Sequence, residues 1–119
     1  MKENQGQQNF FDMLADRGFT LRTKPVKYIK SRKGMILKGN LDVELTLDMS
    51  QLTNKYDCAI LLSGDSDFEA LVRFVRSKGK QVIVISSRWH IAKELIQAAH
   101  VYIPLEKLRK DWERKKGKL

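Results

Sequence analysis

One stretch near the middle of the chain decides the fold, and it reads Ala59-Ile60-Leu61-Leu62-Ser63-Gly64-Asp65-Ser66-Asp67-Phe68. Its apolar half predicts a buried strand, and its polar half places Asp65 and Asp67 directly after that strand. In open α/β sheets, ligands bind outside the carboxyl ends of the strands. Carboxylate oxygens are the ligands that a hard divalent cation such as Mg²⁺ prefers. The stretch therefore suits a metal site at that edge of the sheet.

The same residues also fit an ordinary helix start. Ser66 and Glu69 have the spacing of a capping box, and acids in a first turn are favoured by the helix dipole. Capping does not explain the tight turn at Ser63 and Gly64, or two crowded carboxylates whose repulsion must be offset. A metal ion would offset it, and on spacing alone both interpretations stay open.

Helix and strand patterns alternate along most of the 119 residues, which is typical of a single α/β domain, 1–119, with a mainly parallel sheet and helices on both faces. One segment, Leu41–Leu52, alternates like a strand but also has helical spacing over a longer span, which favours a helix. The predicted elements are a helix around Phe10–Leu14 ended by Gly18, an irregular connection or small hairpin at Pro25–Lys38, a helix at Leu41–Leu52, a strand at Asp57–Leu62, a helix at Asp67–Lys78, a strand at Gln81–Ile85, a helix at Arg88–Ala99, a strand at Val101–Ile103 and a charged helical tail at 104–119.

The net charge of +9 is distributed unevenly along the chain. Thr20–Gly39 carries seven Lys or Arg and no acid, whereas Asn40–Ala70 carries seven acids and one Lys. An acidic centre between basic flanks fits a cation site with Lys and Arg around it that attract a polyanion. We favour binding of nucleic acid as the reason for the basic charge over a basic surface that only contacts solvent.

Composition also limits the class of protein. No apolar run approaches the roughly 20 residues that a membrane helix needs, so we expect no membrane association. The first residues lack the apolar core of a signal peptide, which makes the cytoplasm the expected location. Cys58 is the only cysteine, which excludes an internal disulfide, and we expect it to be a buried residue of the strand.

Further candidate residues lie near the ends of other predicted elements. Asp42 would add a third carboxylate if its helix begins at the same sheet edge, although alone it reads as a first-turn acid. Ser87 and Arg88 follow a strand and could hold a phosphate, an interpretation that competes evenly with serine caps and a solvated arginine. Trp89 could stack on a base, but packing is the more frequent fate of a helix tryptophan.

Two long segments, Lys38–Met49 and Tyr56–Phe68, resemble the NYN domain family of the PIN-like nuclease superfamily, of the LabA-like kind, and the likeness continues through Gly79–Ile85 and Leu95–Leu105. The resemblance implies a three-layer α/β/α PIN-like (Rossmann-like) fold and metal-dependent cleavage of RNA. It also places three residues of this chain at the positions of family acidic residues, namely Asp42, Asp65 and Asp67.

The chain departs from the family pattern at its start. Family members usually begin with a strand that carries an aspartate in a pattern like Ile-Asp-Gly-x-Asn, and Met1–Asn9 has neither an apolar strand nor an aspartate. His100 stands where the family tends to have an acid. We therefore expect a sheet without the usual first strand and a site without one acidic ligand. A homodimer that shares elements could fill the gap.

The leading hypothesis is a metal-dependent endoribonuclease-type domain in which Asp42, Asp65 and Asp67 hold Mg²⁺ or Mn²⁺ and catalyse hydrolysis. The residues expected to contact the RNA are Lys38, Ser63, Ser87 and Arg88. The first alternative is a non-catalytic RNA-binding or protein-interaction module on the same fold. The second is a Toprim-like metal domain, which also places Asp-x-Asp after a strand but expects a glutamate after an N-terminal strand that this chain lacks.

Overall fold

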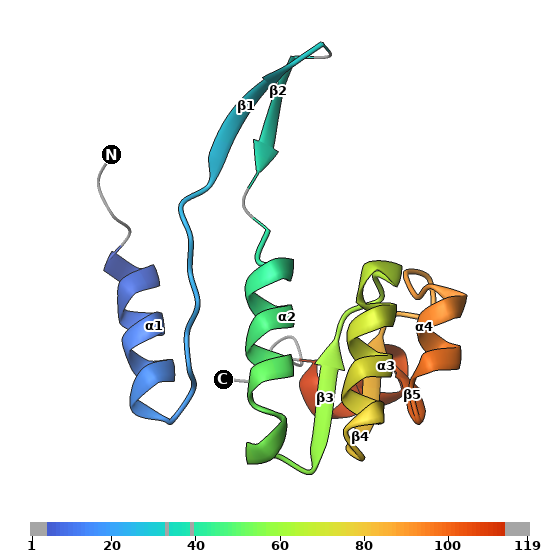
Figure 1. Ribbon diagram of the computed structural model, residues 1–119. Helices are drawn as coiled ribbons and strands as arrows, with labels where there is room; N and C mark the ends of the chain where they lie inside the picture. Colours follow the sequence, from blue (N-terminus) through green and yellow to red (C-terminus); the bar gives the residue numbers. More distant parts are fainter. Residues whose placement is uncertain (1–4, 33, 39, 114–119) are drawn as a thin grey trace. The chain divides into compact units, whose positions relative to one another are not determined.

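The computed structural model describes residues 5–32, 34–38 and 40–113 (Figure 1). It comprises two compact units, Met1–Glu44 and Leu45–Leu119, which are described in turn. Within the described ranges, no helix has the length and apolar character needed to cross a membrane. The single domain 1–119 remains a prediction.

The first unit contains a helix and a two-stranded hairpin. Helix α1, Gln5–Asp16, ends at Gly18, whose φ of +94° is the left-handed conformation that favours glycine. The amide of Gly18 donates to the carbonyl of Ala15 at 3.0 Å, which satisfies one of the last carbonyls of the helix. Strands β1, Lys27–Ser31, and β2, Gly34–Lys38, pair antiparallel. The helix predicted around Phe10–Leu14 is confirmed and begins earlier, at Gln5. The segment predicted as an irregular connection or a small hairpin forms the hairpin.

Helix α2, Asp42–Gln51, resolves the ambiguous segment as a helix. The division between the two units falls inside α2, and the helix itself is unbroken. Its last turn is followed by a 3-10 turn, Thr53–Lys55. The Tyr56 hydroxyl then donates to the Met49 carbonyl at 2.6 Å, which satisfies one of the carbonyls left free at a helix end. Partial burial raises the pKa of Tyr56.

The second unit is built on a parallel three-stranded sheet in the order β3-β4-β5. The strands are β3, Cys58–Leu62, β4, Gln81–Ser86, and β5, Val101–Pro104. Helix α3, Glu69–Ser77, connects the first two, and α4, Lys93–Ala98, connects the last two (Figure 1). Because the strands are parallel, all three carboxyl ends lie at one edge of the sheet. The predicted strands and the predicted parallel arrangement are confirmed, but β3 is not the buried strand that was predicted, because Ile60 and Leu62 on one of its faces are exposed.

Side chains of the sheet, α3 and α4 form the core of this unit. Alternation along β3 buries Ala59 and Leu61 and leaves Cys58 exposed, so the prediction of a buried Cys58 is wrong. Helix α3 packs against both β4 and α4. The buried core residues are Ala59, Leu61, Phe68, Leu71, Val72, Val75, Val82, Val84, Leu95, Ala98 and Ala99.

The helix predicted at Arg88–Ala99 begins five residues later than expected, at Lys93. Ala92 has extended dihedral angles and is the residue before the helix. The Ala92 amide donates to the Gly64 carbonyl at 3.0 Å, a bond to another loop that holds the segment outside the helix. The chain from Ser87 to Ala92 is therefore a loop at the carboxyl end of β4. After β5 come a 3-10 turn, Leu105–Leu108, and the short helix α5, Arg109–Trp112.

Candidate metal centre

The loop that follows β3 carries two carboxylates in a fixed backbone conformation. The Asp67 amide donates to Asp65 Oδ1 at 2.9 Å, and the Asp65 amide donates to Ser63 Oγ at 3.2 Å. A short 3-10 turn, Ser66–Phe68, follows, and Phe68 is buried in the core. Both aspartates are exposed at the sheet edge. The loop thus uses one oxygen of Asp65 for its own structure, and the remaining lone pairs of a carboxylate can bind a ligand.

The predicted capping box of Ser66 and Glu69 is wrong. The residue that caps the turn is Asp65, because the chain enters α3 through a 3-10 turn rather than starting the helix at Ser66. The Glu69 carboxylate instead pairs with Arg73 one helical turn later at 2.9 Å. Asp65 therefore has a structural role at the helix start as well as a position suited to a ligand.

Gly64 is enclosed between two loops at the sheet edge. A Cβ atom on Gly64 would lie 1.9 Å from the His90 carbonyl oxygen and 2.6 Å from Ser86 Oγ. The Gly64 carbonyl accepts the Ala92 amide at 3.0 Å. Only glycine allows this approach, because the nearest obstructing atom belongs to the backbone. The loop after β4 therefore fixes the position of the loop that carries Asp65 and Asp67.

Asp42 completes a group of three carboxylates with Asp65 and Asp67. One oxygen of each lies within 4.8 Å of the others. Asp42 is the first residue of α2. Three carboxylates this close repel one another, and a divalent cation removes the repulsion. A set of three carboxylate oxygens is the donor chemistry that Mg²⁺ and Mn²⁺ prefer.

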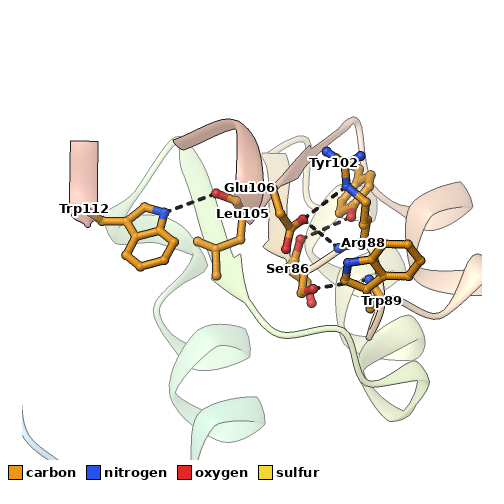
Figure 2. Close-up of polar contacts among 8 residues, drawn as sticks. Ser86, Arg88, Trp89, Tyr102, Leu105, Glu106 and Trp112 are labelled. Carbon is orange, nitrogen blue, oxygen red and sulfur yellow. Dashed lines mark hydrogen bonds and ion pairs between the residues drawn. The ribbon is translucent and has the colours of Figure 1, made fainter. Parts of the chain in front are cut away.

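Arg88, predicted to contact phosphate, is hydrogen-bonded to the Glu106 carboxylate of the chain itself (Figure 2). The Arg88 amide donates to Glu106 Oε1 at 3.0 Å, and Arg88 Nε lies 3.5 Å from the same oxygen. The bond from the Arg88 amide, followed by that from the Ser87 hydroxyl, lowers the pKa of Glu106 to about 2. Arg88 thus binds an anionic group of the chain itself, and the contacts of Ser87 and Arg88 with phosphate remain predictions. Sequence reasoning missed Glu106, although it follows β5, whose carboxyl end lies at the same edge as that of β4.

The other two predicted RNA contacts, Ser63 and Lys38, belong to different units of the chain. Ser63 follows β3 directly and accepts the Asp65 amide, so its oxygen supports the loop of the carboxylates. Lys38 is the last residue of β2 in the first unit, and its side chain lies outside what the structure describes. Both remain predicted contacts.

Glu106→Gln should remove the part of the pH dependence of the unfolding free energy that comes from ionisation of Glu106. The folded-state pKa of Glu106 is held at about 2 against an ordinary value of 4.5, so the ionised carboxylate stabilises the fold at neutral pH. This contribution should be complete above about pH 5 and be lost progressively as the pH falls towards 2. Urea unfolding of wild type and of Glu106→Gln between pH 2 and pH 5 measures this contribution. An unfolding free-energy difference that stays constant down to pH 2 would contradict the assignment.

Comparison with known proteins supports a specific family. The model of the NYN domain family matches residues 2–106. The Low amplitude and bright protein LabA of Synechococcus elongatus is 36% identical over 112 residues, which cover 92% of this chain and 60% of that protein. The chain therefore spans about three fifths of the length of that relative.

A solved structure agrees with the fold. The crystal structure of a protein of unknown function, VPA0982 from Vibrio parahaemolyticus, matches with a TM-score of 0.69 and 32% identity, covering 88% of this chain and 64% of that one. The parallel sheet, the connecting helices and this match fit the predicted PIN-like α/β/α fold. On the family match and the identity to LabA together, the chain belongs to the NYN domain family, of the LabA-like kind.

Proposed function

We propose that this chain is a metal-dependent endoribonuclease domain in which Asp42, Asp65 and Asp67 hold Mg²⁺ or Mn²⁺. The observation that carries the proposal is the approach of the three carboxylates to within 4.8 Å. They include the two that follow β3, at the edge where α/β sheets bind ligands. Membership of the NYN domain family supports a nuclease-like domain related to RNA.

Some residues of this chain would hold the cation, and others would attract the substrate. The hydrogen bonds from backbone amides to the side chains of Ser63 and Asp65 fix the acidic loop before any ligand binds, which lowers the entropic cost of assembling the site. A divalent cation bound there would polarise the phosphodiester and lower the pKa of a water molecule. The net charge of +9 favours approach of the RNA backbone in a salt-dependent way.

One observation favours a non-catalytic RNA-binding module as the second candidate. Arg88, one of the residues expected to hold a phosphate, is bound to Glu106. A centre with fewer phosphate donors would bind RNA without cleaving it, and retained, salt-sensitive binding without cleavage would identify this case.

The test is cleavage of an end-labelled single-stranded RNA by the purified chain. We expect internal cleavage with Mg²⁺ or Mn²⁺, none with EDTA, and recovery when excess metal is added back. Cleavage that persists unchanged in EDTA would refute the proposed role of the three carboxylates. Binding without cleavage in either metal would select the non-catalytic module.

A further inference from the structure

Trp89 is an exposed aromatic residue at the carboxyl edge of the sheet. The helix predicted around it does not form, and 79% of its surface is exposed, so the expectation that it packs is wrong. Most of the indole surface is therefore in water, where it adds no burial free energy to the fold. The exposed indole is therefore available to contact a ligand.

The turn that carries Trp89 is held at several points, as Figure 2 shows in part. The Trp89 amide donates to Ser87 Oγ at 3.2 Å, and the His90 amide donates to the Ser87 carbonyl at 3.0 Å. Before it in the chain, the Arg88 amide is bound to Glu106. The backbone under the indole is thus ordered in advance, which reduces the entropy lost when a flat ligand binds to the ring.

The same turn contacts the loop of the carboxylates. The His90 carbonyl faces Gly64 so closely that a Cβ would lie 1.9 Å from its oxygen. Trp89 and Asp65 are the immediate neighbours in sequence of these two residues. An exposed tryptophan and a candidate metal ligand are therefore each one residue away from the same backbone contact.

From this juxtaposition we infer that Trp89 stacks on a nucleobase of single-stranded RNA bound with its backbone at the acidic centre. The inference rests on the proposed function, because it takes RNA as the substrate. An indole offers its face to any of the bases, so stacking would position the strand without reading its sequence. Trp89 would thus be a positioning residue that binds the base, while the carboxylates act on a nearby phosphate.

Tryptophan fluorescence isolates this contact, because the chain has two tryptophans. The other, Trp112, donates its indole N–H to the Leu105 carbonyl at 3.2 Å in the segment after β5. Trp112→Phe leaves Trp89 as the reporter, and Trp89→Phe leaves Trp112. We expect a short single-stranded RNA to quench the emission of Trp112→Phe and not that of Trp89→Phe, both in EDTA and in a parallel series with Mg²⁺ that is read before cleavage proceeds.

Affinity provides the second measurement. Trp89→Ala should weaken binding of the RNA roughly 5- to 150-fold, the range found when an aromatic platform is removed. Trp89→Phe should retain most of the affinity. An oligonucleotide of the same length with abasic sites should bind wild type and Trp89→Ala equally, since it keeps the phosphates and lacks the bases. Circular dichroism confirms that each variant is folded.

The outcomes separate this inference from the proposed function. Quenching by RNA together with absent metal-dependent cleavage would support stacking and refute the nuclease. RNA binding that leaves Trp89 emission unchanged, or equal affinities of wild type and Trp89→Ala, would overturn the inference and leave the nuclease untouched. Failure of the wild-type chain to bind the RNA at all would overturn both.

Discussion

Asp65→Asn is expected to reduce metal-dependent RNA cleavage at least roughly 100-fold in kcat/KM, because loss of an outer partner of a metal ligand alone costs 10- to 100-fold. The substitution removes the negative charge that a cation needs. It keeps the Oδ1 atom that accepts the Asp67 amide at 2.9 Å, so the loop should stay in place. Initial rates with Mn²⁺ over a range of RNA concentrations measure the change.

Asp57→Asn is the matched control for Asp65→Asn. Asp57 precedes the other end of β3, and its fully exposed carboxylate forms a long ion pair with Lys80 at 3.9 Å. The same loss of charge there should leave cleavage within about twofold, because exposed ion pairs contribute little. Equal cleavage by wild type and Asp65→Asn, with both inhibited by EDTA, would place the metal elsewhere.

Gly64→Ala should lower both the stability of the fold and the affinity for the cation. The new Cβ would lie 1.9 Å from the His90 carbonyl oxygen, so one of two backbone segments must move. Overpacking of this kind costs about 1–3 kcal/mol. Displacement of the loop should also weaken cation binding, since Asp65 is the next residue. Urea unfolding and a Mn²⁺ titration of the same protein measure the two effects.

Gly79→Ala separates loss of stability from displacement of the loop. Gly79 ends α3 with φ of +77°, and a Cβ there would meet nothing within 4 Å. Alanine should therefore lower stability by about 1 kcal/mol through backbone strain alone, and Mn²⁺ affinity should not change. If Gly64→Ala and Gly79→Ala had the same Mn²⁺ affinity as wild type, the contact at Gly64 would not position the acidic loop.

The strands and the acidic loop could be predicted because their signals are local. The apolar run before Ser63 ends in two acids, and the spacing of Leu41, Leu45, Met49 and Leu52 favours a helix, so the strand and the helix follow from neighbouring residues. The approach of Asp42 is predicted only on the condition that its helix begins at the same sheet edge, and by the family resemblance. The expectation of RNA cleavage comes from the resemblance to the NYN family, whereas the two carboxylates after the strand already indicate a metal site.

The contacts between loops could not be predicted in this way. The late start of α4 depends on the Gly64 carbonyl, 28 positions before Ala92 in the chain, and on the His90 backbone. The bond between Arg88 and Glu106 joins residues 18 apart. Each contact forms only once parallel strands bring their carboxyl ends to one edge, so it depends on tertiary structure rather than on local propensity.

A calorimetric titration with Mn²⁺ at neutral pH tests the central claim most directly, with wild type compared with Asp42→Asn, Asp65→Asn and Asp67→Asn. The three carboxylates that lie within 4.8 Å of one another should bind the ion together. The account predicts saturable binding by wild type that each of the three substitutions weakens at least roughly 10-fold and that Asp57→Asn leaves unchanged. Binding that none of the three weakens, or no binding by wild type, would contradict it.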